Sequence, residues 1–376
     1  MRAALPILAI SSLIAVSGLI VMAAVAAGTF GFDFLAYHQA ATRVLDGQRL
    51  YDPSVQQTGG FGLFYYPPPF VFLALPFALL PAGTATWLWL ALSVVMLVAA
   101  IGILPVRSDV RWAVLLLAGL SWPVAYALKL GQVGPLLLLL LAIAWRAIDR
   151  PVAFGIAGAL GAIVKIQPGL ILVWAVLTRR WTAVLVGAVA LVITGIATTT
   201  LLGGFTVWQD YLALLRNVSD PITTPHNFTP GAAAYQAGFD TVAATVVQVA
   251  SSVLVLAALV LAVLRTRPDA SLLVAVVASQ LLSPVLWDHY AMLLLLPTAW
   301  LLERRQWWAI AIPLVTSAVT LVVNVPAAIY PFVFWVAILG VLAVGLREAR
   351  HDRAAGVRGV AGLDADGDAA RTAIAS

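Results

Sequence analysis

The sequence predicts an all-α polytopic membrane protein, and three observations support this fold class. Of the 376 residues, 62% are hydrophobic and 10% are charged, whereas a soluble globular domain carries about 25% charged residues. The mean hydropathy is +1.02. Apolar runs long enough to cross a bilayer, about 20 residues, recur along the chain and are continuous. Continuous runs favour membrane helices over the alternating strands of a membrane barrel.

The charged residues exclude several classes of site and partner. The formal net charge is +5, and only Lys129 and Lys165 among the 21 basic residues are lysines. In a membrane protein such a balance reflects cytoplasmic loops beside anionic lipid, so membrane lipid and not nucleic acid is the expected partner. The absence of cysteine excludes disulfides, thiolate catalysis and cysteine-ligated metal. No histidine spacing is typical of zinc, and the acidic string 364–368 lacks the glycine and glutamate of a calcium loop. We expect neither a metal nor a cofactor.

The first predicted span, residues 5–27, is longer than the apolar core of a signal peptide, about 7–15 residues. We therefore expect a retained anchor, although AAVAAG resembles a cleavage site. A polar stretch from 31 to 70 follows. Residues 34–46 are predicted to form a helix on the membrane surface, with Asp33 at the N-cap and Gly47 just past its end. Its apolar face holds Phe34, Tyr37, Ala41, Val44 and Leu45.

Three consecutive prolines end at Pro69, and residues 70–80 are predicted to form a partly inserted or re-entrant helix. Further spans are predicted at 84–104, 111–127, 134–145, 152–164, 168–177, 181–202, 241–264, 270–282, 289–302, 306–323 and 328–346. With the first span, the count is about 12 crossings. Several of these spans are short, so some must be tilted, broken or paired as re-entrant hairpins.

Fourteen of the 19 arginines fall on one side of the membrane if the chain crosses 12 times. They are Arg2, Arg107, Arg111, Arg146, Arg150, Arg179, Arg180, Arg265, Arg267, Arg304, Arg305, Arg347, Arg350 and Arg353. The positive-inside rule makes that side the cytoplasm, with both termini there. The opposite side then holds a first outer loop, 28–69, and a long outer loop, 203–240. Residues 1–346 are expected to form one membrane domain, and the polar tail 347–376 is expected to be disordered.

Four candidate residues are ionisable, lie next to apolar segments where a charge is unfavourable, and are predicted to be on the outer side of the membrane. Asp33 is equally compatible with a helix N-cap and with a general base, which must reach an acceptor hydroxyl. Lys165, in AIVKIQPGL, is flanked by apolar residues, where a cation is expensive. A phosphate contact beside the proline break is favoured over a lysine that reaches to the interface. In SPVLWDHY, adjacent Asp288 and His289 at a helix break favour a site over an isolated core histidine.

The turn LKLGQVGP, with Lys129 and Gln132, is as compatible with a structural turn as with a functional one. His38 on the surface helix is expected to be solvated. His226 and Asn227 lie in the long outer loop, where the N-x-S/T strings carry little information.

Five short strings in the sequence resemble those of a known family. The strings DFLAYHQAATRVLDGQRLYDP, YYPPPF, GQVG, KIQP and SPVLWDHY occur in that order. They are similar to the polyprenyl-phosphate-sugar-dependent glycosyltransferases of family 87, which include actinobacterial membrane mannosyltransferases and their arabinofuranosyltransferase relatives. The resemblance covers roughly residues 5–346. It implies a GT-C fold in which Asp33 is the catalytic acidic residue of the first outer loop, and in which Lys165 and His289 lie beside the donor phosphate. Tyr290 stands where many relatives carry a second histidine, and Asn227 matches an expected motif poorly.

The resemblance further implies the reaction and its partners. We expect inverting transfer of mannose from polyprenyl-phosphate mannose to a glycolipid or lipoglycan on the outer face of the plasma membrane. Nothing in the sequence separates this reaction from arabinofuranosyl transfer. A transporter or flippase is disfavoured because the candidate residues lie at outer ends, away from the midplane. The possible substrate contacts are Tyr37, His38, Arg43, Tyr66, Lys129, Gln132, Asn227, Asp288 and Tyr290.

Overall fold

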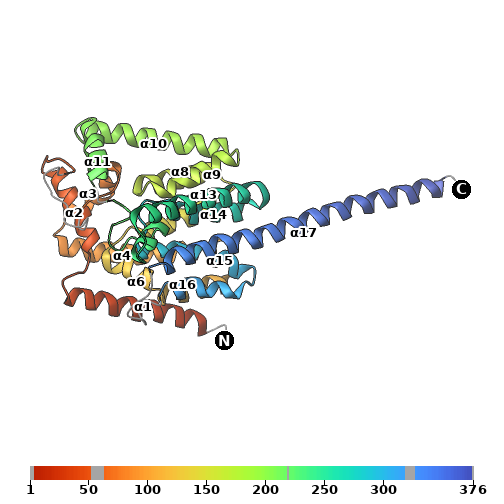
Figure 1. The fold of residues 1–376 in the computed structure, drawn as a ribbon, viewed down its shortest axis with the longest axis horizontal. Coiled ribbons are helices and arrows are strands. Elements are labelled where there is room, and N and C mark those ends of the chain that lie inside the picture. The colour runs from red at the N-terminus through yellow and green to blue at the C-terminus, as the bar shows by residue number, and fades with distance from the viewer. Residues whose placement is uncertain (1–3, 52–62, 218–219, 318–326, 375–376) are drawn as a thin grey trace.

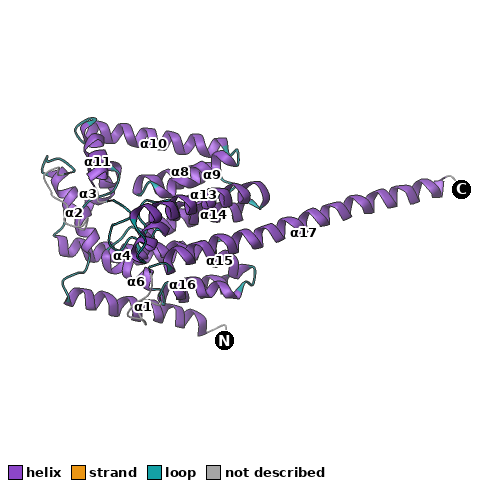
Figure 2. Cartoon of the chain, viewed as in Figure 1, coloured by secondary structure: helices purple, strands orange, loops and turns teal. Residues whose placement is uncertain are grey.

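The computed structural model describes residues 4–51, 63–217, 220–317 and 327–374, with side chains as far as Ala354. Every regular element in these ranges is a helix, and the helices pack side by side in one bundle (Figures 1 and 2). Part of the predicted first outer loop, 52–62, and the end of the predicted span 306–323 lie outside the described residues.

Five of the described helices are long and apolar enough to cross a membrane. They are α1 (Ala4–Ala26), α4 (Ala82–Gly102), α10 (Trp181–Leu201), α13 (Thr241–Arg265) and the part of α17 from Ile329 to Ala354. A sixth span is formed if α5 (Ser108–Gly119) and α6 (Trp122–Leu130), which meet at a bend of 64°, count as one broken helix. A polytopic membrane protein is thus supported, and the predicted count of about 12 crossings is not confirmed.

Shorter helices fill the bundle between the long ones. They are α7 (Gly134–Arg146), α8 (Pro151–Val164), η2 (Gln167–Gly169), α9 (Leu170–Leu177), α14 (Pro268–Leu281), η3 (Asp288–Leu294), α15 (Leu295–Glu303), η4 (Trp307–Ile310) and α16 (Ala311–Val315). Prolines begin α6, α7, α8 and α14, where their missing N–H leaves no bond unmade. Proline therefore sets where these helices start.

One end of the bundle carries the small helices that surround the polar segments. They are α2 (Phe32–Leu45), η1 (Pro68–Phe70), α3 (Val71–Ala78), α11 (Thr206–Asn217) and α12 (Pro230–Gln236). In Figure 1, α2, α3 and α11 lie together at the end opposite to both chain termini. The helix expected at 34–46 is therefore present as α2, and the short helix expected at 70–80 is present as η1 and α3.

The other end of the bundle carries an arginine rim, which we define by four ion pairs. Arg107 pairs with Glu303 at 3.4 Å and Arg180 with Asp149 at 3.4 Å, in both cases between different helix ends. Two further pairs are Arg267 with Asp352 at 2.7 Å, which joins the start of α14 to the middle of α17, and Arg304 with Asp269 at 2.9 Å, which joins the end of α15 to the start of α14. These contacts gather arginines from distant parts of the sequence at one end of the fold.

Helix α17 runs from Ile329 to Ile374 and projects beyond the bundle at the rim end (Figure 1). The disorder predicted for 347–376 is not tested by a single conformation and stays a prediction.

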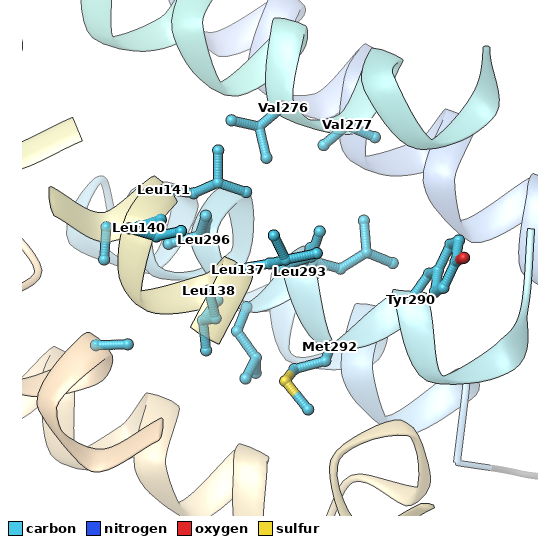
Figure 3. Close-up of a cluster of buried hydrophobic side chains, with 14 of the residues drawn as sticks. Leu137, Leu138, Leu140, Leu141, Val276, Val277, Tyr290, Met292, Leu293 and Leu296 are labelled. Carbon is cyan, nitrogen blue, oxygen red and sulfur yellow. The ribbon is translucent and has the colours of Figure 1, made fainter. Parts of the chain in front are cut away.

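The core between the two ends is apolar and continuous. Figure 3 shows leucines of α7, such as Leu137 and Leu141, facing Val276 of α14 and Leu293 of η3. Tyr290 lies at one edge of this cluster with its hydroxyl pointing away from it. The packed core thus ends at a polar atom on the segment that carries WDHY.

Candidate active site

Asp33 lies in the first turn of α2, and its predicted N-cap position is wrong. Gly31 occupies the N-cap, and no side chain caps the helix. Gly31 has a φ of 73°, a conformation that strains other residues, and a Cβ there would clash with Thr86. Its N–H donates to the Lys129 carbonyl at 2.9 Å. The main-chain turn therefore starts the helix, and the Asp33 carboxylate is left for other partners.

Gln132 is the hydrogen-bond partner of that carboxylate. Its Nε2 donates to Asp33 Oδ2 at 2.6 Å. The residue sits in the turn between α6 and α7, directly after Gly131, whose φ of 69° ends α6. Trp89 of α4 donates from Nε1 to the Gly131 carbonyl at 2.8 Å. The GQVG turn is thus held against α4 and delivers an amide to Asp33.

Two buried tyrosines contact the oxygen of this amide. Tyr66 donates to Gln132 Oε1 at 3.0 Å and Tyr37 donates to the same atom at 3.4 Å. The two phenol oxygens lie 2.6 Å apart. Tyr37 is 1% exposed and Tyr66 is 6% exposed, so neither reaches solvent. The structure therefore brings both predicted contacts into one hydrogen-bonded group with Gln132 and Asp33.

Lys165 lies in the break between α8 and η2, outside both helices, with extended backbone (φ −147°, ψ 142°). Its Nζ donates to the Tyr290 hydroxyl at 2.5 Å and lies 4.0 Å from the centre of that ring. Burial lowers the pKa of Lys165 to about 7, and the nearby charge of Asp33 opposes the shift. The ammonium is thus desolvated and held on an aromatic face.

His289 is the second residue of η3, which begins at Asp288 within the WDHY string. It is 5% exposed, and within the described residues neither ring nitrogen has a hydrogen-bond partner. Its Nδ1 lies 3.4 Å from Asp288 Oδ1, and that oxygen accepts the His289 main-chain N–H at 2.8 Å. A buried imidazole without a hydrogen bond is unusual because a buried polar group that makes no hydrogen bond costs free energy. Such a group is a candidate for contacting a ligand.

Charged groups from these segments affect the pKa of the Asp33 carboxyl. Burial raises the pKa of the Asp33 carboxyl, while the charge of His289, the hydrogen bond from Gln132 and the charges of Lys165 and Lys129 lower it. A carboxylate with a raised pKa is a stronger base than a free one. The carboxylate, the ammonium and the imidazole are therefore close enough to act on one another.

The space between the groups is small as they stand. A cavity lined by Gln132, Lys165, Gln280, His289 and Tyr290, with apolar neighbours, has a volume of about 10 Å³, which holds about one water molecule. A sugar phosphate is far larger than this cavity. A wider hollow of about 410 Å³ lies between α10 and α11, lined by Ile196, Phe205 and Trp208 among others. Its lining has no ionisable group.

Two aromatic residues of α6 lie beside Asp288 and His289, and the sequence analysis missed both. Trp122 and Tyr126 stack with ring centres 4.9 Å apart, and Trp122 Nε1 donates to Asp288 Oδ2 at 3.2 Å. The Tyr126 ring lies 6.3 Å from that of His289 and 5.0 Å from Lys129 Nζ. The spacing of Trp122, Tyr126 and Lys129 on one helix face was the available signal.

Two other predicted contacts, His38 and Arg43, have partners elsewhere. His38 is half-buried and not solvated as expected, and its Nε2 hydrogen-bonds the Leu80 carbonyl at 3.0 Å. Arg43 donates to the Leu50 carbonyl at 2.9 Å. Their roles as substrate contacts stay predictions.

Asn227 is fully buried and hydrogen-bonded through both side-chain atoms. Its Nδ2 donates to the Pro284 carbonyl at 3.0 Å, and its Oδ1 accepts the Leu286 N–H at 2.9 Å. This side chain therefore joins the long outer loop to the segment that leads to His289. A substrate contact for Asn227 also stays a prediction.

In the described part of the chain, no three His, Asp or Glu side chains cluster in a way that could hold a metal ion.

The comparisons with known proteins agree on one family. Residues 64–284 match glycosyltransferase family 87. The chain is also 28% identical over 295 residues to a polyprenol-phosphate-mannose-dependent alpha-(1-2)-phosphatidylinositol mannoside mannosyltransferase of Mycobacterium tuberculosis, covering 69% of this chain and 67% of the relative. No solved structure matches the chain. The family match includes Gln132 and Lys165 but neither Asp33 nor His289. Because that match spans more than half of the sequence, the chain belongs to glycosyltransferase family 87.

Proposed function

We propose that this glycosyltransferase, whose family and relative indicate a mannosyltransferase, transfers mannose with inversion from polyprenyl-phosphate mannose to a glycolipid or lipoglycan. One observation carries the assignment of the site. Asp33, Lys165 and His289 come from three distant segments, and Lys165 and His289 line one cavity with Gln132, the residue that hydrogen-bonds the Asp33 carboxylate. These are the groups that a displacement at a sugar phosphate requires.

Asp33 acts as the general base in this proposal. An acceptor hydroxyl gives its proton to the free oxygen of the carboxylate as the hydroxyl oxygen bonds to the anomeric carbon. Such proton transfer contributes about 10²–10⁴-fold to the rate. The bond between the anomeric carbon and the phosphate oxygen breaks at the same time, and polyprenyl phosphate leaves with the bonding electrons. A single displacement inverts the anomeric centre.

Lys165 and His289 stabilise the leaving phosphate. Charge develops on the phosphate oxygens as the bond breaks, and prearranged cations and N–H donors lower the energy of that state. His289 offers ring nitrogens that make no hydrogen bond among the described residues, and Lys165 offers an ammonium beside Tyr290. A phosphate that replaces the Tyr290 hydroxyl as the acceptor satisfies the lysine.

We infer that this chemistry takes place outside the cytoplasm, in a single membrane domain formed by residues 1–346. The arginine rim and the small helices around Asp33 lie at opposite ends of the bundle (Figure 1). Arginine-rich ends face the cytoplasm in plasma-membrane proteins. The proposal retains 12 crossings, with the shorter helices crossing as bent or paired segments, and it leaves both termini in the cytoplasm.

Purified protein in lipid nanodiscs, incubated with radiolabelled polyprenyl-phosphate mannose or polyprenyl-phosphate arabinofuranose and a glycolipid extract, tests the donor. Mass spectrometry of the product identifies the acceptor and linkage. We expect transfer from the mannose donor and none from Asp33→Asn, which keeps the side-chain shape and removes the base. Transfer from the arabinofuranose donor alone supports the second sugar. Wild-type turnover by Asp33→Asn contradicts the base, and movement of intact donor across the bilayer without transfer supports a flippase.

A further inference from the structure

The side chain of Gln132 is more constrained than that of an ordinary buried amide. It is 7% exposed, its nitrogen donates to Asp33 Oδ2 at 2.6 Å, and its oxygen accepts from Tyr66 at 3.0 Å and Tyr37 at 3.4 Å. Both ends of the amide are therefore occupied, and each is occupied by a different kind of group.

The chemistry of these partners permits one orientation of the amide while Asp33 is ionised. A carboxylate only accepts hydrogen bonds, whereas a phenol can donate one. If the amide were turned over, its oxygen would face the negative Asp33 oxygen across the same short distance, and repulsion would result. The donors instead form a directed chain in which Tyr37 and Tyr66 donate to Gln132, and Gln132 donates to Asp33. Hydrogen bonds in such a chain polarise one another.

The tyrosines that set this orientation are themselves held in place. Tyr51 donates from its hydroxyl to the Tyr66 carbonyl at 2.6 Å. The Tyr66 ring stacks on Phe70, with ring centres 4.6 Å apart, and the Tyr37 ring packs edge-on against Phe70 at 5.1 Å. The aromatic residues of the YYPPPF string thus form a rigid support for one amide.

We propose that Gln132 is a positioning residue, whose amide, oriented by Tyr37 and Tyr66, keeps Asp33 ionised and turns one carboxylate oxygen toward the acceptor hydroxyl. The inference rests on the proposed role of Asp33 as base. It assigns to Gln132 a function that acts through Asp33, where the sequence predicted a substrate contact. A hydrogen bond to the charged form opposes the effect of burial on a carboxyl group.

Other groups also face Asp33, and the proposal must be separated from their effects. The cationic ones are Lys129, Lys165 and His289, and the phenolic ones are Tyr37, Tyr66, Tyr126 and Tyr290. Substituting Gln132 leaves all of these charges in place. A change in the titration of Asp33 in such a variant therefore reports the amide.

Two variants test the proposal. Gln132→Met keeps the length of the side chain and removes the donor. Tyr66→Phe keeps the ring and the amide but removes the hydroxyl that orients it. We expect Gln132→Met to lower kcat by about 10- to 100-fold, consistent with the loss of one charge-assisted hydrogen bond, and to leave the donor KM within twofold. The acidic limb of the pH–rate profile moves up by about one pH unit, and Tyr66→Phe moves it less in the same direction.

Gln248→Ala is the matched control, because Gln248 accepts the Gly231 N–H at 3.0 Å and belongs to α13. It removes an amide hydrogen bond of the same kind and should leave the acidic limb unchanged. If Gln132→Met raises the donor KM while the limb stays in place, Gln132 contacts the donor and does not position Asp33. Wild-type kcat and pH profile in Gln132→Met also overturn the proposal.

An infrared titration removes the dependence on turnover. The carboxyl C=O band that disappears in Asp33→Asn reports the protonation of Asp33 in protein without substrate. We expect its midpoint to rise in Gln132→Met and, less, in Tyr66→Phe. An unchanged midpoint in both variants ends the proposal even if transfer is confirmed. A raised midpoint supports the amide's role even if Asp33 proves not to be the catalytic base.

Discussion

The ammonium nitrogen of Lys165 lies 2.5 Å from the hydroxyl oxygen of Tyr290, although the two residues are 125 positions apart in the chain. The same nitrogen lies 4.0 Å from the centre of the Tyr290 ring. The lysine ammonium therefore makes a hydrogen bond to a neutral hydroxyl and a cation–π contact with the same ring. We propose that the donor phosphate replaces the Tyr290 hydroxyl as the hydrogen-bond acceptor of Lys165.

Removal of the Lys165 charge should weaken use of the donor. We expect Lys165→Ala to lower kcat/KM for the donor by about 10- to 150-fold, the range for one hydrogen bond to a charged group. Lys165→Arg should recover part of the loss because it restores the charge with a different geometry. Steady-state kinetics with purified donor measure both. Arg49→Ala, which removes an exposed charge 3.9 Å from Asp210, serves as control and should stay within twofold of wild type.

The pH dependence of donor binding should follow the protonation of Lys165. Burial lowers its pKa to about 7, so the ammonium that attracts phosphate is lost as the pH rises through that value. Donor affinity should fall by up to about tenfold per pH unit, until the pH reaches the higher pKa that the lysine has beside a bound phosphate. Calorimetric titration from pH 6 to 9 measures this fall. In Lys165→Arg, whose guanidinium stays charged, the slope should vanish. A slope that persists there assigns the titration to another group.

Removal of the His289 imidazole should reduce turnover without unfolding the protein. Within the described residues its ring nitrogens make no hydrogen bond, so His289→Ala breaks none. We expect a loss in kcat of about 10²- to 10³-fold, as for one donor to a developing anion, with a melting temperature in detergent close to that of wild type. A marked fall in melting temperature with normal kcat would instead assign a packing role to the imidazole.

Asn227 should show the opposite behaviour. Its buried side chain bonds to Pro221, Pro284, Thr229 and Leu286, and each buried group left unsatisfied costs about 1–3 kcal/mol. Asn227→Ala should lower the melting temperature by about 5 °C or more. Residual activity per folded molecule should fall because the loop before His289 loosens. An unchanged melting temperature with a raised acceptor KM supports the substrate contact predicted from sequence.

The side of the membrane that carries Asp33 can be mapped by labelling, because the chain contains no cysteine. We expect Asp46→Cys, exposed at the end of α2, to react with an impermeant maleimide on intact cells. Asp149→Cys, whose native side chain is 86% exposed in the arginine rim, should react only after permeabilisation. The reverse pattern places the site in the cytoplasm and contradicts the proposed topology.

The class of the protein and the segments of its candidate site follow from the amino-acid sequence alone. Composition and run length indicate membrane helices, because apolar segments of this kind are stable only where lipid surrounds them. Prolines mark where helices start, so the break at Lys165 and the small helices after the first span were predicted close to their observed bounds. The strings around Asp33, Lys165 and His289 were also recognisable, because costly polar groups interrupt apolar runs there.

The contacts that each of these side chains makes depend on how the helices pack in the tertiary structure. Asp33 reads as an N-cap in the sequence, but the turn at Gly31 shifts the helix start and gives the carboxylate to Gln132, 99 residues away. Asn227 reads as a loop residue but is buried and pins the segment before His289. Local patterns encode helix, turn and burial. A hydrogen bond between residues about 100 positions apart depends on how whole helices pack, and no periodicity in the sequence records that.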